Sequence, residues 1–260
     1  MNAPQHFGFT SSYNAINREE RNLAAIFYHC LNLPGNLERF VAHVAPSTPL
    51  DPNHVGVFYE YSFLRDLWHW ASDKPNAEAL KRAFILAQLP GVAAYGLENM
   101  SVLEFNTFFG AVPKASETYI QHPRFLSLSR YAERVKDNPQ LLQAISEFKW
   151  CFNAKPDIVI HCNASESIVI EAKDESSEGL YPASESEKTI FKNAGLSYVS
   201  QTHIQRKIMA MLGLEMTGVF LITKDEEAPE GYRKLLWREA FQLFNLEDIP
   251  RFMHERIERC

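Results

Sequence analysis

Two short apolar runs, separated by a polar stretch, constrain the fold of this chain more than any other feature. Ile158–Ile160 and Ile168–Ile170 each read Ile-Val-Ile, and the segment Asn163–Ser167 between them is polar. β-Branched residues favour strands, and a turn-forming segment between two such runs predicts an antiparallel hairpin. Folding the hairpin about its turn places Ile158 opposite Ile170. We therefore expect the chain to be organised around a hairpin over residues 156–173.

This pairing brings two acids and a lysine onto one face of the hairpin. Side chains alternate between the faces of a strand, so Asp157 shares a face with Glu171 and Lys173. Asp157 lies directly opposite Glu171, where Cβ atoms are roughly 4.5–5.5 Å apart. Two carboxylates at that distance repel each other unless a cation lies between them or one of them holds a proton. The spacing predicts part of a divalent-metal site. The alternative, an ordinary amphipathic hairpin with exposed acids, leaves this repulsion uncompensated.

The residue types at this face suit chemistry on a phosphate. Mg²⁺ prefers carboxylate oxygens and keeps several water molecules that substrate phosphates can replace. A lysine beside the metal can steady an attacking water, while the metal neutralises the charge that builds up on the phosphate. Lys173, two residues after Glu171, has the position for this role.

The same residues carry a resemblance to a known family. Pro156-Asp157 and Glu171-Ala172-Lys173, each joined to an Ile-Val-Ile run, resemble the motif of the PD-(D/E)XK nuclease superfamily. The resemblance implies an α/β (α+β) fold with a central mixed β-sheet flanked by helices, restriction-endonuclease-like, with a mainly helical insertion. It implies Mg²⁺, for which Mn²⁺ can substitute, held by Asp157, Glu171 and the carbonyl of Ala172. Lys173 would position and activate the water that hydrolyses a phosphodiester bond.

A glutamate near the start of the chain is the expected third acid. Residues 17–33 are predicted to form the first core helix, and Glu20 projects from its apolar side. Members of the resembled superfamily often carry a glutamate that points into the metal site from the helix before the motif strands. We assign that role to Glu20, with Glu19 behind it. Asn17-x-x-Glu20 is also a capping-box pattern, and in that alternative Glu20 only caps its own helix.

A glutamine on a later helix is the remaining candidate. Tyr198–Leu212 is predicted to be helical, and Gln205 lies on its apolar side, one turn after Gln201. Many members of the family place a glutamine on this helix, sometimes in a Gln-x-x-x-Tyr motif. Here Met209 stands where the tyrosine would be, so assignment to that subgroup is in doubt. Gln205 would orient the water or a phosphate, or else hydrogen-bond local backbone.

The rest of the chain is expected to surround this core as one nuclease domain, residues 1–260. Residues 36–150 are predicted to be a mainly helical insertion, and residues 151–260 the catalytic core. Beyond the hairpin, the core is expected to hold an exposed acidic loop over Asp174–Glu187, a buried strand over Thr217–Thr223 and a closing helix over Tyr232–Phe244. Within the insertion, the expected helices are Ser62–Ser72, Asn76–Leu89 and Asn138–Trp150.

Composition limits the classes of protein to which this chain can belong. A chain of 260 residues with 46% hydrophobic residues can bury a substantial core. It has no apolar run near the ~20 residues that span a bilayer, and no signal peptide is expected at its start. A net charge of −6 argues against a globally basic nucleic-acid coat but is compatible with a local basic groove. The cysteines show no metal-ligand spacing and fit a reducing, cytoplasmic compartment: Cys30, Cys151, Cys162 and Cys260.

The expected function is a metal-dependent nuclease. Its substrate is expected to be DNA rather than RNA, its role restriction, defence or repair, and a homodimer is compatible with it. The alternative from another class is a catalytically inactive, nuclease-like module that binds nucleic acid or protein. A third hypothesis, Lys173 as a Schiff-base nucleophile, requires a neutral amine, whereas nearby carboxylates favour its charged form.

Overall fold

The chain divides into two compact units, each of which is assembled from separate segments. A computed structural model describes His6, Gly8, Thr10 and residues 19–111, 115–173, 178–223 and 227–259. The first unit contains the hairpin, and the second unit contains most of the helices. The first unit is Met1–Tyr61, Pro156–Ser177 and Leu214–Cys260, and the second is Ser62–Lys155 and Glu178–Gly213. Residues of the predicted catalytic core, 151–260, therefore occur in both units.

The first unit is built on a mixed five-stranded sheet with the order β1-β2-β3-β6-β7. Neighbouring strands are antiparallel from β1 to β3, and parallel from β3 to β7. This agrees with the expected class, an α/β protein in which helices flank a mixed sheet. The strands are β1 (Gly56–Tyr59), β2 (Ile158–His161), β3 (Glu166–Lys173), β6 (Glu215–Ile222) and β7 (Tyr232–Leu236). The helices are α2 (Glu20–Leu31), α3 (Asn36–Val44), α11 (Trp237–Gln242) and α12 (Arg251–Ile257).

The predicted hairpin and its register are confirmed. Strand β2 pairs with β3 so that Ile158 faces Ile170 and Ile160 faces Ile168. Asn163 shapes the turn, because its side-chain oxygen accepts hydrogen bonds from the backbone N–H groups of Ser165 and Glu166. The four isoleucines face the same side of the sheet, so a shift of one residue would turn those of one strand to the other face.

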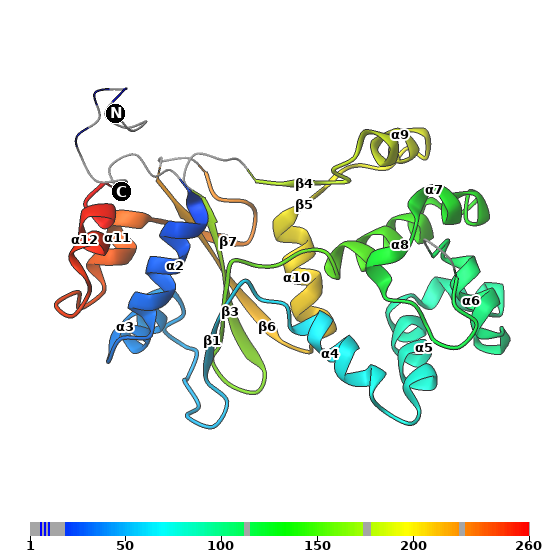
Figure 1. Cartoon of the computed structure of the whole chain (residues 1–260), viewed down its shortest axis with the longest axis horizontal. Coiled ribbons are helices and arrows are strands. Elements are labelled where there is room, and N and C mark those ends of the chain that lie inside the picture. Colours follow the sequence, from blue (N-terminus) through cyan, green and yellow to red (C-terminus); the bar gives the residue numbers. More distant parts are fainter. Residues whose placement is uncertain are drawn as a thin grey trace. The chain divides into compact units, whose positions relative to one another are not determined.

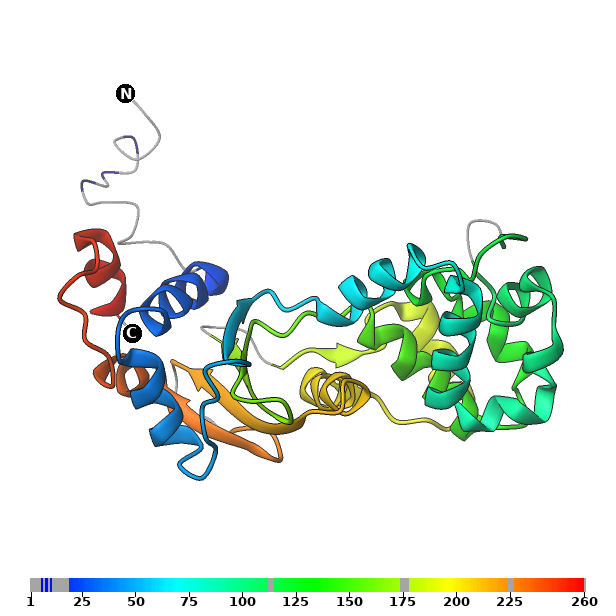
Figure 2. The same ribbon diagram turned by 90° about the horizontal axis from the view of Figure 1, so that it is seen from below.

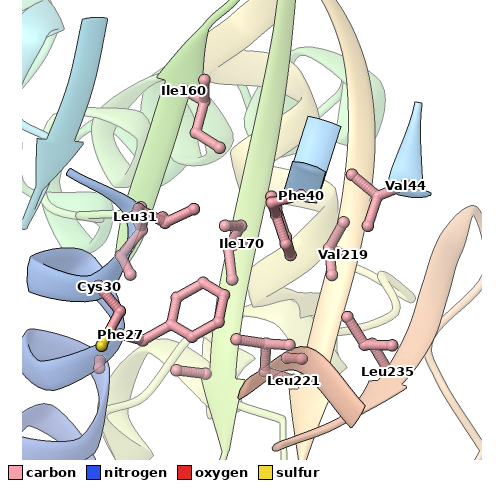
Figure 3. Close-up of a cluster of buried hydrophobic side chains, with 14 of the residues drawn as sticks. Phe27, Cys30, Leu31, Phe40, Val44, Ile160, Ile170, Val219, Leu221 and Leu235 are labelled. Atoms are coloured by element: carbon pink, nitrogen blue, oxygen red, sulfur yellow. The ribbon is translucent and has the colours of Figure 1, made fainter. Parts of the chain in front are cut away.

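One face of this sheet is covered by helices and forms the main core. Figures 1 and 2 show α2 and α3, in blue, on the same side of the sheet as α11. Phe27 lies at the centre, with its ring 5.4 Å from that of Phe40 and 5.7 Å from that of Trp237. The strands contribute aliphatic side chains such as Ile170, which lies near the rings of Phe27 and Phe40 (Figure 3). This burial fixes which face of β3 remains for Glu171 and Lys173.

The parallel edge of the sheet corrects one prediction. Tyr232–Phe244 was expected to be a single helix, but its first five residues form β7, and the helix begins only at Trp237. Arg, Lys and Leu in this segment favour a helix locally, and pairing with β6 overrides that preference. Gly218 of β6 lies opposite Tyr232, and a Cβ at Gly218 would lie 2.8 Å from the tyrosine ring.

Strand β1 is a short strand that the sequence did not indicate. It lies at the edge of the sheet beside β2, although residues 36–150 were expected to be mainly helical. Its sequence, Gly-Val-Phe-Tyr, is rich in β-branched and aromatic residues, yet four residues are too few to show strand periodicity. Only the pairing with the hairpin identifies it as a strand.

The second unit is mostly helical (Figure 1). The three helices expected between residues 62 and 150 are present as α4, α5 and α8, and Asn138 caps α8 through its side chain. The segment expected as an acidic loop instead contains β4 and α9 beyond residue 177, while residues 174–177 lie outside the described part of the chain. The helices are α4 (Phe63–Ser72), α5 (Ala77–Gln88), α6 (Val102–Phe108), α7 (Leu128–Tyr131), α8 (Pro139–Cys151), α9 (Glu185–Asn193) and α10 (Gln201–Met211). The 3-10 helices are η2 (Pro90–Tyr95), η3 (Leu97–Asn99), η4 (Pro123–Phe125) and η5 (Ala132–Arg134), and β4 (Leu180–Tyr181) pairs with β5 (Val199–Ser200).

In the described ranges, no helix has both the length and the apolar character needed to cross a membrane.

Candidate functional site

The hairpin brings Asp157, Glu171 and Lys173 together on the face opposite the main core. The register that pairs Ile158 with Ile170 sets Asp157 across from Glu171. The Asp157 Oδ2 atom accepts a hydrogen bond of 2.9 Å from the backbone N–H of Ala172. Lys173 Nζ forms an ion pair with Oε1 of Glu171. The predicted motif residues thus form one contiguous cluster at the end of β3.

Glu20 joins this cluster from helix α2. Its Oε1 atom lies 3.6 Å from Lys173 Nζ. The helix is capped instead by Glu19, whose Oε1 accepts a hydrogen bond from the backbone N–H of Arg21 at 3.4 Å. Asn17, the other member of the expected capping box, lies outside the described residues. Of the two neighbouring glutamates, Glu20 is therefore the one that contacts the motif.

Burial makes the charges of this cluster strongly dependent on one another. Glu171 is completely buried, and the side chain of Lys173 is 8% exposed. Burial raises the pKa of Asp157 from 3.8 to about 8, and the charges of Glu171 and Glu20 act in the same direction. The Ala172 N–H and the charge of Lys173 oppose this rise without cancelling it. Asp157 consequently holds a proton at neutral pH.

Lys173, unlike Asp157, is charged at neutral pH. Burial acts to lower the pKa of its ammonium group, but the charge and hydrogen bond of Glu171, followed by the charge of Glu20, outweigh it. The pKa of Lys173 is therefore raised above its usual value, and the side chain stays charged. Its strand is also held in place, because Trp237 Nε1 donates a hydrogen bond of 2.9 Å to the Lys173 carbonyl.

The cluster has the donor chemistry for a hard cation, but its acids are not gathered around one point. In the described part of the chain, no group of three or more Asp, Glu, His or Cys side chains is arranged to hold a metal ion. Burial and the charge of Glu171 raise the pKa of Asp157, and a cation such as Mg²⁺ beside these carboxylates would act against that rise. Lys173 now fills part of that role, since it contacts both Glu171 and Glu20. A metal ion bound to Glu171 would therefore compete with Lys173 for the same carboxylate.

Two predicted residues have less direct support. Ala172 is buried, and its N–H binds Asp157, while its carbonyl as a metal ligand stays a prediction. Gln205 is fully buried in α10 of the second unit, and Gln201 begins the same helix. The roles of both glutamines likewise stay predictions.

Glu60 is a further acid, not identified from the sequence, whose backbone contacts this cluster. Its backbone N–H donates a hydrogen bond of 2.8 Å to the Asp157 carbonyl, and its carboxylate lies 3.7 Å from Arg21 Nε. Glu60 has a φ of 53°, a left-handed conformation that is costly for a residue with a side chain. Nearby, Tyr59 donates a hydrogen bond to the carbonyl of Arg21, and its pKa is raised by burial and then by the charges of Glu60 and Asp157. The sequence offers no signal for Glu60, because an acid after an aromatic pair is common on any surface.

Any function assigned to this chain must rest on its own residues and their geometry. Comparison of the chain with models of protein families, with curated proteins and with solved structures finds no match.

Proposed function

We propose that this chain is a metal-dependent nuclease that hydrolyses phosphodiester bonds, in DNA rather than RNA. The observation that carries the proposal is the cluster of Asp157, Glu171 and Lys173 at one end of a mixed sheet, with Glu20 beside it. A buried lysine held between two glutamates, opposite a protonated aspartate, has no evident value for packing alone. It suits a site that must gather positive charge around a phosphate.

The fold of the first unit supports a relation to the PD-(D/E)XK superfamily. Its five-stranded sheet is mixed, and helices cover one face, as a restriction-endonuclease-like core requires. The helix before the motif strands, α2, directs Glu20 to the motif lysine. Both features go beyond the short motif, which by itself occurs easily by chance.

The residues of the chain divide the work in this proposal. Asp157, Glu171 and Glu20 would hold Mg²⁺ or Mn²⁺, which supplies Lewis acidity and positive charge when it is bound. Lys173, charged at neutral pH, donates hydrogen bonds from Nζ to the attacking water or to a phosphate oxygen. Asp157 must lose its proton to become a ligand, so cation binding releases a proton and strengthens as the pH approaches about 8.

A second candidate is a non-cleaving interaction module. The ion pair between Lys173 and Glu171 is already formed, and the described acids do not surround a metal position, so the cluster could serve stability alone. A Schiff-base enzyme is disfavoured, because the raised pKa of Lys173 keeps its amine protonated.

Cleavage assays decide between the nuclease and the module. Plasmid, linear and single-stranded substrates are incubated with the chain in Mg²⁺, in Mn²⁺ or in EDTA. The wild type is expected to cut with either metal and not in EDTA. Lys173→Ala should slow cutting by about 10²–10³-fold, and Lys192→Ala, an exposed lysine of α9, should cut like the wild type.

Two further variants separate catalysis from folding. Lys173→Arg keeps a positive charge beside Glu171, so the fold is retained, but it moves the hydrogen-bond donors and should still cut at least about tenfold more slowly. Glu20→Gln removes a charge that is partly exposed, so it should reduce cutting while circular dichroism and melting stay close to wild type. A Lys173→Ala variant that cuts at the wild-type rate would exclude the nuclease assignment. Nucleic-acid binding without any cutting would favour the module.

A further inference from the structure

A pocket in the second unit carries an inference that is independent of the hairpin. A cavity of about 250 Å³ lies among α4, α5 and the segment 119–125. This volume is slightly below the roughly 300–1,000 Å³ of pockets for drug-sized ligands, so it suits a small ligand that is partly exposed at the mouth of the pocket. We call it the Trp68 pocket, defined by Trp68, Lys81, Tyr119, Gln121, His122 and Phe125.

Aromatic side chains form much of its wall. Trp68 is buried, and its ring lies 5.8 Å from that of His122. Tyr119 and Phe125 are exposed at 58% and 36%, so they line the pocket where it is open to solvent. Flat aromatic surfaces of this kind stack against planar rings, and every nucleobase presents such a face.

Lys81 gives the pocket a buried cation. The residue is 6% exposed, and its Nζ donates a hydrogen bond of 2.6 Å to Ser72 Oγ and lies 4.8 Å from the Trp68 ring centroid. In the described residues it forms no ion pair, and burial lowers the pKa of Lys81 while the charge of Asp73 acts against this. A buried ammonium group with one hydroxyl partner has capacity left for an anion.

The charges around His122 are also positive. Burial, followed by the charges of Arg124, His69, Arg65 and Lys81, lowers the pKa of His122 to about 4. The ring is therefore neutral at pH 7, and its Nδ1 accepts a hydrogen bond from the backbone N–H of Arg124 at 3.2 Å. The proton of the neutral ring then lies on Nε2, which is buried and has no hydrogen-bond partner among the described residues. The pocket thus combines aromatic walls, an available donor group and a positive potential.

We propose that the Trp68 pocket binds a single nucleotide, with the base stacked among its aromatic walls and the phosphate paired with Lys81. A planar base matches the walls, its polar edge matches the amide and imidazole groups of Gln121 and His122, and the phosphate supplies the missing anion. A purely apolar ligand would leave Lys81 without a counter-charge, and a bare phosphate would leave the aromatic wall uncovered. The nucleotide can be free or one unit of a single strand, since both offer the same groups.

This proposal stands apart from nuclease activity, because every residue of the pocket belongs to the second unit. Binding is measured in EDTA, where no metal-dependent cleavage occurs. A failure to bind nucleotides would leave the cleavage test untouched, and a failure to cleave would leave this test untouched.

The test is a titration of the whole chain with the common 5′-mononucleotides, adenosine, phenyl phosphate, inorganic phosphate and short single-stranded oligonucleotides. Binding is monitored by calorimetry or by tryptophan fluorescence. At least one mononucleotide or oligonucleotide is expected to bind with a Kd of about 1 mM or tighter. Tighter binding of the oligonucleotide identifies a strand as the source, and tighter binding of the mononucleotide identifies a free nucleotide. The proposal would be overturned if neither mononucleotides nor oligonucleotides bound at concentrations well above about 1 mM. It would also be overturned if phenyl phosphate bound as tightly as any nucleotide.

Two matched lysines make the test specific. Lys81→Met keeps the length of the buried side chain, and should weaken nucleotide binding about tenfold or more while leaving adenosine binding unchanged. Lys74→Met is the control, because Lys74 also lies over a tryptophan ring, at 3.9 Å from the Trp70 centroid, but does not line the pocket. Tyr119→Ala, at an exposed position, should weaken nucleotide and adenosine alike. Equal losses for Lys74→Met and Lys81→Met would contradict the proposed phosphate contact.

Discussion

Asp157→Asn offers a test of the electrostatics of the hairpin that does not depend on any activity. Folding raises the pKa of Asp157 from 3.8 to about 8, so the folded chain holds a proton that the unfolded chain has released. Stability falls with rising pH wherever the folded state binds more protons. The contribution of Asp157 to the stability of the wild type should therefore fall as the pH rises from about 4 to about 8, and level off above that.

The magnitude follows from the same pKa. Each pKa unit corresponds to about 1.4 kcal/mol. The rise from 3.8 to about 8 thus penalises the ionised carboxylate by up to about 5–6 kcal/mol. Asparagine has nearly the same shape, and its amide oxygen can still accept the hydrogen bond from Ala172. The variant should be close to wild type at pH 4, and more stable by several kcal/mol at pH 8.5.

Urea unfolding of both proteins across this pH range measures the difference. Histidines such as His122 and His161, whose pKa values are lowered by burial, affect both proteins equally and cancel in the comparison. Asp248→Asn, at an exposed position in the same unit, is the control and should leave the pH dependence unchanged. A wild type and an Asp157→Asn variant with parallel curves from pH 4 to 8.5 would refute the reasoning.

Substitutions at three places test the remaining features of the fold. Lys173→Ala leaves Glu171 buried without its cation and should lower the free energy of unfolding by about 3–5 kcal/mol. Glu171→Gln combined with Lys173→Met should recover most of that loss in urea unfolding, and no recovery would mean that the pair is not the cause. Glu60→Gly should be more stable than Glu60→Ala by about 1 kcal/mol, because only glycine avoids the cost of the left-handed φ, and the reverse order would disprove that strain. Gly218→Ala should cost about 1–3 kcal/mol in thermal unfolding, because its Cβ would meet the ring of Tyr232, and an unchanged Tm would contradict this close approach.

The hairpin shows how far local sequence reaches. The isoleucines of Ile158–Ile160 and Ile168–Ile170 pack together in the main core, and this fixes both the register and the side on which Asp157 and Glu171 lie. The helices α4, α5 and α8 were likewise predictable, because both signals for a helix are local in the sequence. These signals are apolar periodicity and a capping residue such as Asn138.

What lies far apart in the chain was decided only by tertiary structure. The residues of β7 prefer a helix locally, and become a strand because β6 offers them a parallel partner. The sequence places Lys173 on the face of Asp157 and Glu171, but only folding buries it between Glu171 and Glu20, which come from different elements. The left-handed turn at Glu60 and the division of the chain into two units have no local signal either. Periodicity reports which face of an element is apolar, whereas burial, charge coupling and strand partners depend on groups that only folding brings together.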